Sequence, residues 1–97
     1  MKIVSHKKLI EFYSLHHQAK VPLENWYHLA KKSKWKNFKD IKNDFNSADA
    51  IGNQRYVFNI KGNSYRLVVV IQFNHGYIFI RFVGTHDEYN KTDCKNI

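Results

Sequence analysis

A histidine and a tyrosine stand close together in the segment Thr85–Lys91, which reads THDEYNK. Histidine can accept or donate a proton near neutral pH, because its unperturbed pKa is about 6.5. Tyrosine can donate a proton or stack on a nucleobase. RNA cleavage needs a base for the 2′-hydroxyl proton, an acid for the leaving 5′-oxygen, and cations that stabilise the pentavalent phosphate. His86 and Tyr89 are therefore candidates for this chemistry if the fold places arginines beside them.

The arginines that could complete such a site lie in segments with the alternating pattern of β-strands. The stretch RYVFNIKGNSYRLVVVIQF (55–73) contains two strands around Gly62-Asn63, and YIFIRFVG (77–84) forms a third after His75-Gly76. Two-residue turns at these positions fix the strand pairing. One face of the sheet is then apolar and packs on helices, through the pairs Ile60–Tyr65, Phe58–Leu67, Ile71–Ile80 and Val69–Phe82.

The same pairing places polar and charged residues on the opposite face of the sheet. They are Asn59 across from Arg66, Val70 across from Arg81, Thr85 beside Arg66, and Lys61 at the edge. Charges on one face of a sheet are often only a solvated surface. The planar fork of arginine also suits phosphate oxygens, and the third strand leads directly into His86. The strand pattern alone leaves both interpretations open.

Other reaction classes fit the sequence less well. The six histidines and Cys94 show no zinc spacing, and there is no glycine-rich phosphate loop because the glycines fall at strand ends. Asp87 and Glu88 are neighbours whose side chains are expected to diverge, and no serine has a convincing base partner. We therefore expect neither a metal nor another cofactor.

The first half of the chain has the periodicity of helices. After Ser5, a suitable N-cap, comes an apolar stripe of Leu9, Phe12, Tyr13 and His16. After Pro22, which suits the first turn of a helix, comes a stripe of Leu23, Trp26, Tyr27 and Ala30. We expect the core to use both stripes. Residues 34–46 are expected to form a short helix or an ordered loop.

The composition is that of one small, basic domain over residues 1–97. There are 16 Lys and Arg against 8 Asp and Glu, which gives a net charge of +8. Such a charge attracts polyanions such as RNA, and equally an acidic protein. Cys94 is the only cysteine, so no internal disulfide can form. Because there is no apolar leader or membrane span, we expect a cytoplasmic protein.

The run from Trp35 to Asp93 resembles the HigB branch of the RelE/ParE toxin superfamily. The resemblance rests on Trp35 followed by Asp40-Ile41, on the strand block VFNIKGNSYRL (57–67), and on the ending Thr85–Tyr89. It implies an α+β, RelE-like fold in which two N-terminal helices pack on one face of a small antiparallel β-sheet. RNA is then expected on the other face.

The resemblance also implies the toxin of a type II toxin–antitoxin pair, inhibited by a HigA-like antitoxin. Such a toxin is an mRNA endonuclease that acts without a metal on the translating ribosome, at the A site of the 30S subunit. Carried over onto this sequence, the strand arginine is Arg66, the catalytic position after the last strand is His86, and the C-terminal tyrosine is near Tyr89. The other residues expected to contact RNA are Asn59, Lys61, Arg81 and Lys91.

Two features depart from the superfamily pattern. Val57 and Asn59 stand where RelE uses strand lysines, so the RelE mechanism cannot be transferred whole. Asn90 stands where HigB sequences usually have an aspartate. If that acid orients the histidine, Asn90 does so less strongly.

Two other functions are compatible with the sequence. ParE-like members of the superfamily inhibit DNA gyrase without cutting nucleic acid, and a basic module could bind RNA or the ribosome without catalysis. His86 together with Tyr89 favours the nuclease, because a gyrase inhibitor needs no proton-transfer group at that position.

Overall fold

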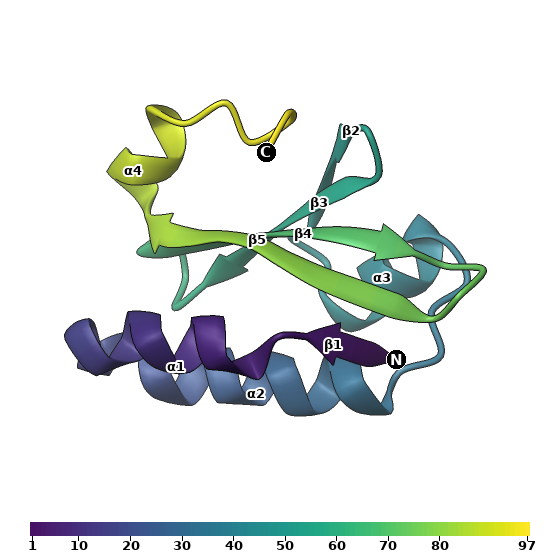
Figure 1. The fold of residues 1–97 in the computed structure, drawn as a ribbon, viewed down its shortest axis with the longest axis horizontal. Helices are drawn as coiled ribbons and strands as arrows, with labels where there is room; N and C mark the ends of the chain where they lie inside the picture. Colours follow the sequence, from purple (N-terminus) through teal and green to yellow (C-terminus); the bar gives the residue numbers. More distant parts are fainter.

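The computed structural model describes residues 1–97 as a layered α+β fold (Figure 1). The elements in chain order are β1 (Lys2–Val4), α1 (His6–Leu15), the short 3-10 helix η1 (His17–Ala19), α2 (Lys20–Lys32), α3 (Phe38–Asp44), β2 (Asp49–Gly52), β3 (Arg55–Ile60), β4 (Tyr65–Gln72), β5 (Tyr77–Thr85) and α4 (His86–Asn90). Figure 1 shows α1 and α2 side by side under the sheet, and α4 with the C-terminal segment above it. The predicted α+β architecture, with two N-terminal helices on one face of a small sheet, is confirmed.

The sheet has five strands in the order β1-β5-β4-β3-β2. Strands β2 to β5 pair antiparallel, whereas β1 pairs parallel to β5 and makes the sheet mixed. The two edge strands were not predicted, because segments of three and four residues carry too little alternation to be recognised. Since β1 covers only residues 77–79, the rest of β5 is an uncovered edge.

The hairpin of β3 and β4 has the predicted register. Ile60 pairs with Tyr65, Phe58 with Leu67, and Asn59 with Arg66. The strands are joined by residues 61–64, with positive φ angles at Lys61 (52°) and Gly62 (63°). Because this turn is centred on Gly62-Asn63, it gives the same pairing as the two-residue turn expected there.

The predicted register of the second hairpin, β4 with β5, is wrong. Its turn spans residues 73–76 and is centred one residue before His75-Gly76, so Ile71 pairs with Ile78 instead of Ile80. The same register pairs Val69 with Ile80 rather than Phe82, and a bulge between Val68 and Val69 then shifts the pairing by one residue. The remaining corrected pairs are Val68–Phe82, Val70–Phe79, Arg66–Gly84 and Tyr65–Thr85.

The bulge decides where two side chains of β5 lie. Phe82 packs on the outer face of the sheet against the buried cluster that contains Val57 and Val68, not on the inner face. Arg81 has no partner in β4 and is exposed at the edge of β5, where it lines a shallow hollow with Lys8 and Glu11 of α1.

Phe58 in β3 is the centre of the inner face. Its side chain is only 1% exposed. The centroid of its ring lies 5.3 Å from that of Trp26 in α2, and 6.1 Å and 5.2 Å from those of Trp35 and Phe45, which flank α3. These contacts tie α2 and the α3 region to the sheet.

The two predicted helical stripes supply the rest of this core. Leu9 of α1 is buried, as are Leu23, Trp26 and Ala30 of α2. Ser5 occupies the N-cap of α1 and Pro22 lies in the first turn of α2, as predicted. No helix in the structure is both long and apolar enough to cross a membrane.

The outer face of the sheet is partly covered by α4 and the residues after it. Cys94 is buried in a cluster with Val57 of β3 and Val68 of β4. Arg55 Nε donates to the Ile97 carbonyl at 2.9 Å, and the Asn53 amide donates to the Lys95 carbonyl at 3.2 Å. The face expected to meet RNA is therefore open only in part.

Candidate functional site

The short helix α4 carries both His86 and Tyr89, and a capping box fixes where it begins. Thr85 is the N-cap: its hydroxyl accepts from the Glu88 amide at 3.2 Å, and its own amide donates to the Glu88 carboxylate at 2.8 Å. This hydrogen bond from the Thr85 backbone lowers the pKa of the Glu88 carboxyl. The two bonds satisfy backbone donors that the first turn of a helix leaves free.

The turn between β3 and β4 accepts hydrogen bonds from both the Arg66 side chain and the His86 backbone. The Arg66 guanidinium donates from Nη1 to the carbonyl of Asn63 at 3.2 Å. The backbone amide of His86 donates to the next carbonyl in the chain, that of Ser64, at 3.2 Å. The Arg66 guanidinium and the His86 backbone therefore contact neighbouring carbonyls of one turn, and the side chain of His86 is exposed.

Arg66 and Tyr89 are in contact. The guanidinium carbon of Arg66 lies 5.8 Å from the centroid of the Tyr89 ring, which is within cation–π range. Burial raises the pKa of the Tyr89 phenol, although Arg66 opposes the rise. The phenol is therefore protonated at neutral pH and can donate a hydrogen bond or a proton. Asn59, paired with Arg66 on β3, completes this group.

The side chains of the three other residues predicted to bind RNA do not contact Arg66, Tyr89 or His86. The Lys61 ammonium hydrogen-bonds to the Gln18 side chain of η1. Arg81 stands at the β5 edge beside α1, because of the bulge. Lys91 is exposed at the C-cap of α4, at the opposite end of this helix from His86.

A second histidine near α4 was not identified from the sequence as a site residue. His16 stacks on Phe12 with ring centroids 4.3 Å apart and meets the Tyr65 ring edge-on at 5.8 Å. It also contributes to lowering the pKa of the Glu88 carboxyl. No sequence pattern indicates that His16 lies near α4, because it only ends an apolar stripe. Asn90 makes no side-chain hydrogen bond to His86.

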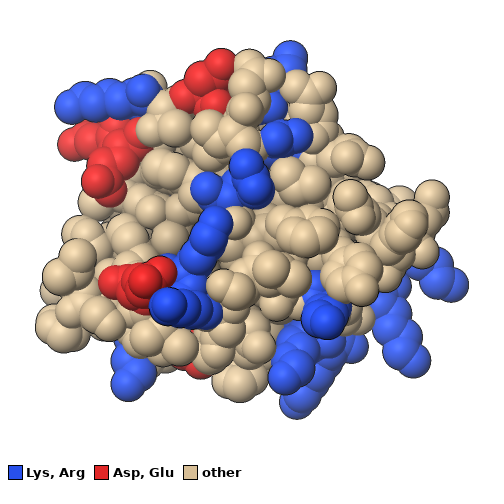
Figure 2. Space-filling view, in the orientation of Figure 1, with Lys and Arg blue, Asp and Glu red and all other residues tan.

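The positive charge of the chain is not neutralised within the molecule. The two ion pairs of the structure both involve Glu24, with His6 and with His28. Figure 2 shows Lys and Arg side chains in a stripe that crosses the visible face from the helical layer, over β5, to the C-terminal segment. This surface is free to attract a polyanion.

The α+β fold is consistent with that of a RelE-like toxin. The family model for HigB toxins, described as the RelE-like toxic component of a toxin–antitoxin system, matches residues 19–92. The chain therefore belongs to the HigB toxin family. A comparison with curated protein sequences gives no significant match.

The capping box leads to a prediction about the position of α4. Thr85→Ala should lower the free energy of unfolding by about 1 kcal/mol, since the N-cap oxygen is lost. Thr85→Ser is the matched control, because it keeps the hydroxyl and should stay within a few tenths of the parent value. Urea unfolding of the three proteins measures the difference. Equal stability of Thr85→Ala and the parent would contradict the role of the cap.

The free energy of unfolding should also depend on pH, with a sign that follows from the pKa of the Glu88 carboxyl. Its pKa is lowered in the folded chain, so its stabilising contribution is fully present above the ordinary value of 4.5. The contribution is lost as the pH falls through the lowered pKa. Thr85→Ala keeps the backbone donor, so the matched variant is Glu88→Gln, whose loss of stability relative to the parent should shrink in acid.

Proposed function

We propose that this HigB-family toxin is an endoribonuclease that cleaves messenger RNA on the translating ribosome and so inhibits translation. The observation that carries the proposal is the arrangement of Arg66, Tyr89 and His86 around the β3–β4 turn. A proton acceptor, a protonated phenol and a planar cation are the groups that this cleavage requires. RelE-like toxins are generally ribonucleases, which supports the same assignment.

The proposed reaction uses the 2′-hydroxyl of the RNA as nucleophile. His86 removes its proton, the 2′-oxygen attacks the adjacent phosphorus, and the bond to the 5′-oxygen breaks. Tyr89 donates the proton that the leaving 5′-oxygen takes up, since its phenol is protonated at neutral pH. Arg66 stabilises the charge on the pentavalent phosphate through its planar fork. The products are a 2′,3′-cyclic phosphate and a 5′-hydroxyl, and no step involves a metal.

The remaining predicted residues act in binding rather than in proton transfer. Asn59 lies across from Arg66 and can hydrogen-bond a nucleotide held there. Lys61, Arg81 and Lys91 are exposed and contribute charge along the path of the strand. In this proposal the messenger presented at the 30S A site is the substrate.

Membership of the HigB family implies an antitoxin partner. The large apolar side chains that remain exposed are all in the N-terminal third: Val4, Ile10, Leu15, Val21 and Leu29. Leu15 and Val21 are 83% and 66% exposed, so the helical layer keeps apolar surface in addition to its core stripes. A HigA-like antitoxin has both this surface and the basic surface available for contact.

Replacement of His86 tests the proposed function. His86→Gln should keep the fold, because the imidazole is exposed, and should reduce messenger cleavage about 10²–10⁴-fold. Cleavage of a messenger on translating ribosomes measures the effect, with circular dichroism as the check on folding. His28→Gln on α2 is the control and should cleave like the parent. A folded His86→Gln protein with undiminished cleavage would rule out the proton-transfer role.

A second prediction concerns the guanidinium group of Arg66. Arg66→Lys keeps the charge but loses the planar, bidentate donor, so cleavage should fall clearly below the parent rate. Lys32→Gln, at the end of α2, removes a whole charge from an exposed position and should have little effect. Equal rates for Arg66→Lys and the parent would show that Arg66 is only a solvated cation.

A further inference from the structure

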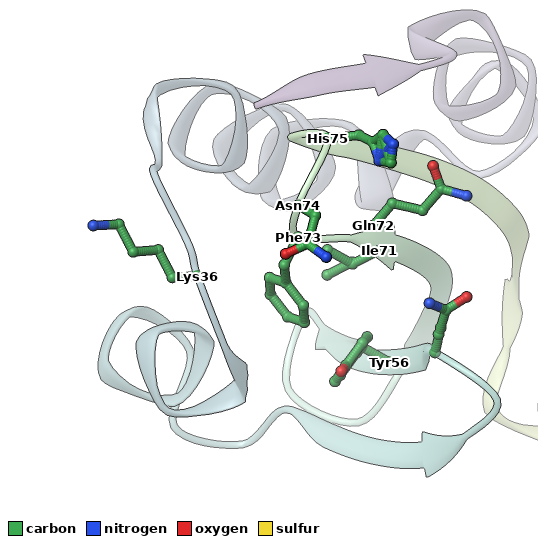
Figure 3. A pocket seen from close by; sticks show the side chains of 8 residues that line it. Lys36, Tyr56, Ile71, Gln72, Phe73, Asn74 and His75 are labelled. Atoms are coloured by element: carbon green, nitrogen blue, oxygen red, sulfur yellow. The ribbon is translucent and has the colours of Figure 1, made fainter.

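The end of the sheet opposite α4 contains a hollow of about 350 Å³. Figure 3 shows it between the β4–β5 turn, the strand β3 and the loop before α3. None of the proposed cleavage residues lines it. Its volume falls within the range of small-ligand sites, about 300–1,000 Å³.

The polar side chains around this hollow are not engaged within the protein. Gln54, Gln72 and Asn74 each present a side-chain amide, and none of these amides makes an intramolecular hydrogen bond. The Tyr56 hydroxyl and the His75 ring are likewise free of such bonds. Each amide offers both a donor and an acceptor, which is the combination that the edges of nucleobases require.

Two aromatic rings supply a surface for stacking. Phe73 and Tyr56 lie with ring centroids 5.7 Å apart at an interplanar angle of 76°, and both are half-buried. Figure 3 shows them next to each other within the hollow. Stacking on such rings tolerates any base, because every base has a π-face.

The charge around the hollow selects an anion. Lys36 and His75 line it, and no aspartate or glutamate does. Figure 3 shows the Lys36 side chain extending away from the rings, so its ammonium adds positive charge beside the hollow rather than inside it. A second hollow of about 400 Å³ shares Lys36, Phe73, Asn74 and His75, and it adds Lys34. The two hollows therefore adjoin, and together they suit a nucleic-acid strand better than one small anion.

We propose that this pair of hollows binds an unpaired segment of single-stranded RNA, with a base against Phe73 and Tyr56 and a phosphate near Lys36. Because the site lies at the other end of β4 from Arg66, it holds RNA without taking part in cleavage. The inference goes beyond the proposed nuclease and rests on it only in taking RNA as the polyanion.

The test is an NMR titration of the full chain with a short single-stranded oligonucleotide. Its sugars carry 2′-O-methyl groups, so the chain cannot cleave it. Amide signals of Gln54, Asn74 and His75 should shift on binding. Phe73→Leu keeps an apolar side chain but removes the π-face, and should weaken binding at these signals on the order of tenfold. Lys7→Gln on α1 is a control that removes a distant exposed charge and should bind like the parent.

Asn74→Ala is a second variant that keeps the proposal testable if Phe73→Leu folds poorly, because Asn74 is exposed. It too should bind more weakly. If either folded variant binds the oligonucleotide with the affinity of the parent, the inference is overturned. It is also overturned if inorganic phosphate alone shifts the same amide signals as far as the oligonucleotide does. Messenger cleavage by the parent is measured in parallel. Cleavage without oligonucleotide binding at these hollows refutes this inference alone, whereas binding here without any cleavage refutes the nuclease alone.

Discussion

The burial of Phe58 among three aromatic neighbours is the interaction on which the rest of the structure depends. Trp26 comes from α2, and Trp35 and Phe45 flank α3, so one side chain of β3 joins both helical segments to the sheet. Aromatic side chains bury large areas, which matters in a chain this short. Because the helices are fixed on the inner face, the outer face is left for α4, the C-terminal segment and the proposed RNA site.

The proposed site is held mainly by polar contacts at the ends of elements. Helix α4 has no buried residue and is positioned by the capping box and by the bond from the His86 amide to Ser64. Elements with few buried apolar contacts open more readily than the core. The half-buried Tyr89, packed against the outer cluster and under Arg66, is the main side-chain anchor of this helix. In the proposed nuclease, this arrangement would let His86 adjust to an RNA strand while Arg66 stays fixed on the central strand β4.

Sequence patterns predicted the parts of the fold that depend on local periodicity. The stripes of α1 and α2 were recognised because apolar residues recur at helical spacing, and the β3–β4 register because Gly62-Asn63 marks the centre of the turn. The predicted β4–β5 register was wrong because packing sets the position of the turn and of the bulge in this hairpin. The alternating pattern of YIFIRFVG (77–84) reveals neither of them. That error moved Phe82 to the wrong face and Arg81 to the wrong partner. The contact of Arg66 with Tyr89 agrees with the grouping expected from family resemblance, while the nearby His16 depends on tertiary packing alone.

The chemistry of the cleaved ends tests the central claim most directly. A messenger incubated with translating ribosomes and the toxin would be analysed for the groups at its new ends. Attack by the 2′-hydroxyl predicts a 2′,3′-cyclic phosphate on one fragment and a 5′-hydroxyl on the other. A 3′-hydroxyl with a 5′-phosphate would show attack by water instead, and an intact messenger would show no cleavage. Either of these results would contradict the account of Arg66, His86 and Tyr89 as a ribonuclease site.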